Sequence, residues 1–207
     1  MRRTRRIEGW RAYGPRPTGR EGFAPLSRRL LAGRAIVLAM LQPLAASADE
    51  RSQAKRMHDR LAGVPPTAAV LDQMAADIGA GRTTDAAYRA MEHRSFYDVT
   101  LKNFAMPWTN RDQTVFAPLN DYVATVIGMV RDDLPFNLLL SDDILYTGGN
   151  APGVPAYSPA SNAHYEALES TNANLKTALV RNTQSALTGL PPDATAGVIT
   201  SRAAAEA

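Results

Sequence analysis

Three histidines, His58, His93 and His164, are the residues of this sequence best suited to metal binding or acid-base chemistry. A metal pair on one helix needs two ligands four residues apart, because side chains at that spacing share a helical face. None of the three is followed at that spacing by a second histidine or a carboxylate. The pattern favours polar residues at the surface or in a partly buried position over metal ligands or general bases.

Two pairs of carboxylates, Asp132-Asp133 and Asp142-Asp143, bracket a short apolar segment. Together they could hold a hard cation such as calcium, which needs several oxygen ligands. Neither pair has the alternating ligands and turn glycine of an EF-hand loop. The other interpretation is structural: Asp133 ends a helix, and Ser141 or Asp142 caps a turn.

A binding groove is a further possibility, because several aromatic side chains fall in or beside expected loops and could bind a sugar or a protein. The alternative is that aromatic residues near helix ends close a core. The hydrolytic motif Gly-x-Ser-x-Gly does not occur, nor does a glycine-rich phosphate loop. The residues that we expect to line the groove are Trp108, Asn110, Asp142, Asp143 and Tyr157.

Cysteine does not occur anywhere in the 207 residues. This excludes disulfides, thiolate metal sites, cysteine nucleophiles and covalent haem attachment through Cys-x-x-Cys-His. Methionines such as Met57, Met74 and Met91 fit apolar helical faces, so we interpret them as core residues and not as haem ligands. We therefore expect no cofactor in this chain, and haem c only in a C-terminal part of a longer protein.

Charge divides the chain sharply at residue 48. Residues 1–48 hold ten Arg against two Glu, a net charge of +8, whereas residues 49–207 hold 13 Lys or Arg against 18 Asp or Glu, a net charge of −5. The basic pI of the whole chain thus reflects its first part alone and gives no reason to expect a nucleic-acid partner.

The basic first part is typical of a secretory signal peptide. The apolar run of residues 35–41 ends at Pro43, and Ala46-Ser47-Ala48 offers small side chains to a signal peptidase. We predict cleavage after Ala48 and a periplasmic or secreted product. The run is far shorter than the roughly 20 residues of a membrane span, so we expect no stable span. Both general and twin-arginine export remain open, and a start codon assigned too early would explain the length of residues 1–27.

Apolar spacing predicts an all-α fold over residues 49–190, an irregular bundle of about six or seven short helices with one long Gly/Pro-rich loop. We expect a helix ending near Leu61, one capped by Thr67, one capped by Thr83 or Thr84, and one opened by a Ser95 and Asp98 capping box. No period-two strand pattern persists.

The second half of the expected bundle centres on a buried helix over residues 119–132, with Pro118 in its first turn. A further helix over 136–144 follows, then the loop over 147–161, which holds three Gly and three Pro. A last helix runs from Ser161 to Leu179. Residues 191–207 form the start of a truncated following segment, and we expect loose packing after about Leu190.

Two runs carry a resemblance to known domains. One is the helix-breaking turn at residues 60–67, and the other combines residues 120–122 with residues 131–139. They resemble planctomycete-type, c-type-cytochrome-associated domains of unknown function, over residues 54–145 and more loosely over 182–205. The resemblance implies a large exported protein whose helical modules accompany a c-type haem domain elsewhere. This chain departs from it by lacking Cys-x-x-Cys-His, and no catalytic residue is carried over.

Two functions follow from the sequence. The first is a non-enzymatic interaction or scaffolding module of a larger cytochrome-associated envelope protein, with a redox domain or another envelope protein as its partner. The alternative is an extracellular polymer-binding or polymer-degrading module, with a groove near Trp108 and the 147–161 loop.

Overall fold

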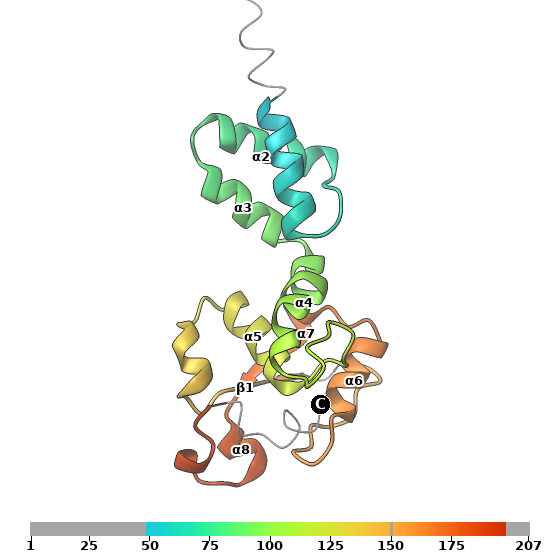
Figure 1. The fold of residues 1–207 in the computed structure, drawn as a ribbon, viewed down its shortest axis with the longest axis vertical. Coiled ribbons are helices and arrows are strands. Elements are labelled where there is room, and N and C mark those ends of the chain that lie inside the picture. Colours follow the sequence, from blue (N-terminus) through green and yellow to red (C-terminus); the bar gives the residue numbers. More distant parts are fainter. Residues whose placement is uncertain (1–48, 150, 198–207) are drawn as a thin grey trace, which may run out of the picture. The chain divides into compact units, whose positions relative to one another are not determined.

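The computed structural model describes residues 49–149 and 151–197 of the chain. The predicted signal segment and its cleavage residues, Ala46 and Ala48, lie outside the described residues. The described part is mostly helical and contains one small antiparallel sheet of two strands, β1 (Leu145–Gly148) and β2 (Leu179–Asn182) (Figure 1). Among these residues, none of the helices combines the length and apolar character needed to span a membrane.

The first three helices cover residues 49–61, α2 (Ala68–Gly79) and α3 (Thr83–Met91). The cap predicted at Thr67 is confirmed, because its hydroxyl accepts a hydrogen bond from the Val70 amide at 3.3 Å. The cap predicted for the third helix is wrong. Arg82 occupies that position without a side-chain cap, and Thr83 is already helical.

A composite helix follows. It starts at residue 94 and continues as the π-helix η1 (Phe96–Leu101), α4 (Lys102–Ala105) and the 3₁₀ turn η2 (Met106–Trp108). The expected capping box is wrong, because Ser95 has helical dihedral angles and makes no cap. The chain is irregular between η2 and α5.

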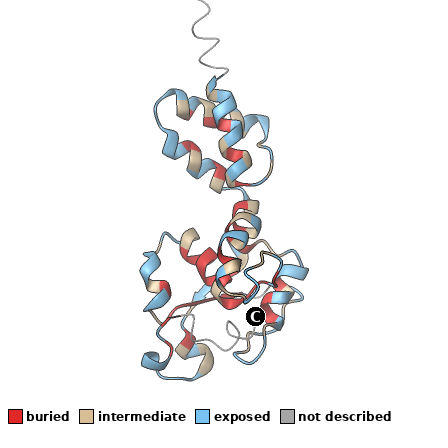
Figure 2. Ribbon diagram, in the orientation of Figure 1, coloured by how far each residue is buried: buried red, intermediate tan, exposed pale blue. Residues whose placement is uncertain are grey.

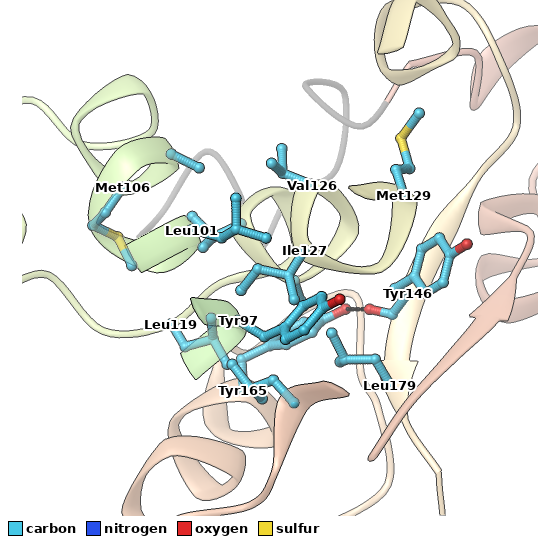
Figure 3. Close-up of a cluster of buried hydrophobic side chains, with 14 of the residues drawn as sticks. Tyr97, Leu101, Met106, Leu119, Val126, Ile127, Met129, Tyr146, Tyr165 and Leu179 are labelled. Atoms are coloured by element: carbon cyan, nitrogen blue, oxygen red, sulfur yellow. Dashed lines mark hydrogen bonds between the residues drawn. The ribbon is translucent and has the colours of Figure 1, made fainter. Parts of the chain in front are cut away.

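Helix α5 (Asp121–Arg131) is the centre of the core, as predicted. The Asn120 side chain caps it by accepting a hydrogen bond from the Val123 amide at 3.0 Å, so Pro118 precedes the helix and is not in its first turn. Residues 123–129 are all buried, which Figure 2 shows as a nearly continuous stretch. Figure 3 shows Ile127 in this core with Tyr97 and Leu119.

The two strands correct the all-α prediction. They pair in the register Leu145 with Asn182 through Gly148 with Leu179. All four residues of β1 are buried, so it shows no alternation of apolar and polar positions, and β2 is too short to establish a period. The helix expected over 136–144 is likewise only the 3₁₀ helix η3 (Phe136–Leu140), after which the chain becomes extended.

The helix expected from Ser161 to Leu179 is divided into three elements. These are α6 (Ala163–Ser170), α7 (Leu175–Ala178) and strand β2. The break occurs where Asn172 adopts a positive φ of 52° and Asn174 caps α7. Apolar spacing across the break mimics one helix because both pieces face the same core.

The chain then forms α8 (Gln184–Thr188) and the 3₁₀ turn η4 (Pro192–Ala194). Gly189 ends α8 in the left-handed conformation, with a φ of 73°. Residues 191–194 and Ala196 are exposed, but the expectation of loose packing beyond residue 190 is wrong for Thr195 and Gly197, which are buried. Thr195 is 2% exposed, and the Gln184 amide donates hydrogen bonds to its carbonyl at 2.8 Å and to the Gly197 carbonyl at 3.2 Å.

Candidate functional site

Buried polar side chains cover the outer edge of strand β1. The Tyr146 amide donates to the Thr125 hydroxyl at 3.1 Å, and the Tyr165 hydroxyl donates to the Tyr146 carbonyl at 3.0 Å, the bond drawn in Figure 3. The Gly148 amide donates to Nε2 of His164 at 2.9 Å. An edge strand presents backbone groups that need partners, and these side chains from α5 and α6 supply them.

The imidazole of His164 is fully engaged by the backbone. Because Nε2 accepts a hydrogen bond from Gly148, Nδ1 carries the proton and donates it to the Pro155 carbonyl at 2.6 Å. The side chain is buried, with 4% exposure. His164 therefore joins β1 to the following loop and offers neither nitrogen to a substrate.

The other two histidines also bind the backbone. Buried His58 donates from Nδ1 to the Val64 carbonyl at 2.7 Å, which holds the turn after the first helix. Exposed His93 accepts from the Ser95 amide through Nδ1 at 3.2 Å. Their rings meet edge to face, with centroids 5.8 Å apart. In the described part of the chain, no group of three or more histidine or carboxylate side chains could hold a metal ion.

Three carboxylates of the predicted pairs, those of Asp132, Asp142 and Asp143, bind different structural partners. Asp143 accepts from the Ser185 amide at 3.0 Å, from the Ser185 hydroxyl, and from the Thr195 hydroxyl at 2.9 Å. Burial raises the pKa of Asp143, but these hydrogen bonds outweigh it and the net pKa is lowered. Asp142 forms an ion pair with Arg181 at 3.7 Å. The second pair thus anchors α8 and the tail.

Asp132 belongs to a network at the end of α5. It accepts hydrogen bonds from Nε of Arg131 at 2.7 Å and from the Tyr146 hydroxyl at 2.5 Å. The Arg131 hydrogen bond is the main reason that the pKa of Asp132 is lowered. Arg131 also donates to the carbonyls of Lys176 at 3.1 Å and Leu179 at 2.6 Å. This network joins α5 to β1, α7 and β2.

The side chains expected to line one groove have different neighbours. Asn110 closes its own loop, donating to the carbonyls of Met106 at 2.7 Å and Thr114 at 2.9 Å. Tyr157 packs edge to face on Tyr165 and His164, with ring centroids 6.1 Å apart in both cases. The Tyr157 hydroxyl is buried without a hydrogen-bond partner among the described residues, and burial raises its pKa to about 12.

Trp108 lies in an exposed cluster of aromatic rings, which we name the aromatic patch. Its ring meets Phe104 and Phe136 edge to face, with centroids 4.8 and 6.3 Å away. Phe104, Trp108 and Phe136 are 57%, 51% and 44% exposed. Of these three residues only Trp108 was expected at a binding surface, because Phe104 and Phe136 fit the apolar spacing of expected helices.

A hollow of about 610 Å³ lies beside the Gly/Pro-rich segment. It is lined by Gly149, Ala151 and Pro152 and, across from them, by residues between 171 and 180. Its walls are small or neutral side chains. A ligand there would meet a concave surface with a few hydroxyl and amide groups. Trp108 does not line this hollow.

A smaller hollow of about 210 Å³ contains charged groups that already have partners. Lys102 forms an ion pair with Glu169, whose other oxygen accepts from the Leu119 amide at 2.9 Å. Asp98 binds Nε of Arg94 at 2.6 Å and the Leu175 amide at 2.9 Å. These groups hold η1 and α4 against the α6 and α7 region.

No family model matches this chain, and searches of curated proteins and of solved structures find no match.

Proposed function

We propose that this chain is an exported helical module that binds another envelope protein through the aromatic patch and catalyses no reaction of its own. The observation that carries the proposal is the exposure of three mutually packed aromatic rings, Phe104, Trp108 and Phe136. Large aromatic side chains are enriched among the residues that dominate binding energy at protein interfaces. When a partner covers these rings, each Å² of apolar surface removed from water contributes about 25 cal/mol of favourable free energy.

The histidine and aspartate side chains that could do chemistry already make structural hydrogen bonds, which supports a binding role. His58 and His164 are buried and bound to the backbone, and Asp132 and Asp143 stabilise helix ends and tail contacts. The proposal includes export through cleavage after Ala48, a periplasmic or secreted location and an irregular bundle of short helices around the 147–161 loop. It also includes a redox domain of that envelope protein as the bound part, and no haem c in this chain.

Site-specific photo-crosslinking tests the patch. A benzoylphenylalanine residue replaces Trp108 or Phe136 in the full chain within the producing cells, and crosslinked species are stained for haem and identified by mass spectrometry. Phe116 is the matched control position, because it is 91% exposed and has no ring contact with the patch. We expect one shared, haem-bearing species from positions 108 and 136. Equal crosslinking from position 116 would refute the role of the patch.

Export is tested separately, by sequencing the N-terminus of the protein recovered from the periplasm or medium. We expect the sequence to begin at Asp49. Recovery of residues 1–48 intact in that fraction would refute this part of the proposal.

A second function, binding of an extracellular polymer, is favoured by the exposed Trp108 ring and by the hollow of about 610 Å³ beside residues 149–152. A polysaccharide pull-down separates the two functions. Saturable binding that is lost in Trp108→Ala and kept in Phe116→Ala would favour the polymer, whereas no polysaccharide binding would leave the protein partner as the better proposal.

A further inference from the structure

A groove lies between the helix of residues 49–61 and α3. It has a volume of about 440 Å³ and is lined by Gln53, Arg56, Met57, Arg60, Leu61 and Ala87. The first five residues stand at offsets of 0, 3, 4, 7 and 8, so they share one face of the first helix. Ala87 supplies the opposite wall from α3, which lies beside this helix in Figure 1.

Among the described residues, the two arginines of the groove have no acidic partner. Nine of the twelve Lys and Arg side chains between residues 49 and 197 form ion pairs. Among these described residues the three without one are Arg56, Arg60 and Arg111. Two of the three thus lie four residues apart on the rim of one groove, and both are exposed.

The nearest acid along the chain does not neutralise the arginines. Asp59, next to Arg60, forms its ion pair with Lys55 on the adjacent face of the helix. The floor between Arg56 and Arg60 is apolar, because Met57, Leu61 and Ala87 are half-buried. The groove therefore combines two unpaired guanidinium groups with a small apolar floor.

We propose that this groove binds an acidic amphipathic helix of a partner protein. Two carboxylates four residues apart on such a helix match the spacing of Arg56 and Arg60, and guanidinium groups bind carboxylates through paired hydrogen bonds. An apolar side chain between the two carboxylates fills the floor at Met57 and Leu61. The site is separate from the aromatic patch and uses none of its residues.

An anionic membrane surface is the competing occupant, and the shape of the site favours the peptide. The lining is a groove with an opposing wall at Ala87, a shape that fits a helix better than a flat lipid surface.

Selection from a random phage-displayed peptide library tests the groove with the full chain as bait. Counter-selection on the Arg56→Gln/Arg60→Gln double variant removes peptides that bind the arginines of residues 1–48. We expect the surviving peptides to carry Asp or Glu at a spacing of three or four residues with Leu, Phe or Met between them. Survivors without that acidic pattern, or no survivors, would overturn the proposal.

The selected peptides are then labelled and measured by fluorescence anisotropy. We expect the double variant to bind about tenfold more weakly, the loss of two partly exposed charge pairs. The control Arg2→Gln/Arg3→Gln removes the same charge from the first part of the chain and should bind like the unchanged chain. Equal weakening in this control would overturn the site.

A third variant, Ala87→Leu, fills the floor while keeping both arginines and a good helix former in α3. We expect it to lose peptide binding with an unchanged unfolding midpoint. Retained peptide binding in this variant would overturn the role of the floor. The last experiment measures binding to vesicles of phosphatidylglycerol and phosphatidylcholine. If vesicle binding requires Arg56 and Arg60 and is kept in Ala87→Leu, the arginines bind a membrane and the peptide proposal is overturned.

Discussion

The substitution Gly128→Ala tests how α5 packs on the sheet. Gly128 faces the ring of Tyr146, and an added Cβ would lie 2.1, 2.4 and 2.5 Å from the ring atoms Cδ1, Cγ and Cε1. The ring cannot withdraw easily, because Tyr146 is fully buried and its hydroxyl donates to Asp132. Its amide and carbonyl are held by Thr125 and Tyr165.

The expected change in the free energy of unfolding has three parts. Replacing glycine with alanine inside a helix normally stabilises by about 1 kcal/mol. Overpacking a well-filled core costs about 1 to 3 kcal/mol. Displacing the Tyr146 ring also weakens its hydrogen bond to a charged group, which is worth about 1.5 to 3 kcal/mol. We therefore expect Gly128→Ala to destabilise the protein by about 1.5 to 5 kcal/mol.

Urea-induced unfolding, followed by far-UV circular dichroism, measures this change. Gly79→Ala is the matched control at the end of α2, where the nearest neighbours of the added Cβ are atoms at the flexible end of Glu50. A double-mutant cycle with Tyr146→Ala tests the cause, because the cost of Gly128→Ala should disappear once the ring is removed. A Gly128→Ala protein as stable as the unchanged chain, or more stable, would refute the packing argument.

Three further predictions concern stability. Ile127→Ala should destabilise by about 2 to 5 kcal/mol, because its side chain is fully buried in the core, and urea unfolding measures the loss. His164→Ala should cost about 2 to 4 kcal/mol and speed hydrogen exchange at the Gly148 amide, which loses its acceptor. Lowering the pH below about 4 should lower the thermal midpoint. Because the pKa values of Asp132 and Asp143 are lower in the folded protein than in the unfolded chain, both carboxylates stabilise the fold at pH values above the unfolded pKa. That stabilisation is lost as both acids are protonated.

Matched variants decide each of these outcomes. Tyr88→Ala changes an exposed side chain and should cost less than about 0.5 kcal/mol. A similarly small cost for Ile127→Ala would place the core elsewhere. His93→Ala is the control for His164, and equal effects would contradict the edge-capping role. Asp132→Asn removes one of the titrating groups, so an acid transition of unchanged size in that variant would contradict its assignment.

Helices whose apolar spacing is local were predictable from the sequence. The face of α5 repeats within eleven residues, and the Thr67 cap lies directly before its helix. Strand β1 was not predictable, because burial on both faces removes its alternation and its edge partners lie 16 to 21 residues away. The aromatic patch was found only at Trp108. Exposure of Phe104 and Phe136 depends on which elements cover them, and helical spacing does not contain that information.

The two-stranded sheet shows where the polar side chains of this fold are used. Two paired strands of four residues are marginal in water by themselves. Buried hydroxyl and imidazole groups complete the β1 edge, and Arg131 binds the Leu179 carbonyl of β2. Side chains committed in this way hold the fold by filling backbone hydrogen bonds. The exposed groups at the aromatic patch and the arginine groove supply apolar contact and charge, and a protein surface binds another protein through both. Polar side chains thus hold the interior of the fold while aromatic and charged side chains remain at the surface, which supports the proposed binding role.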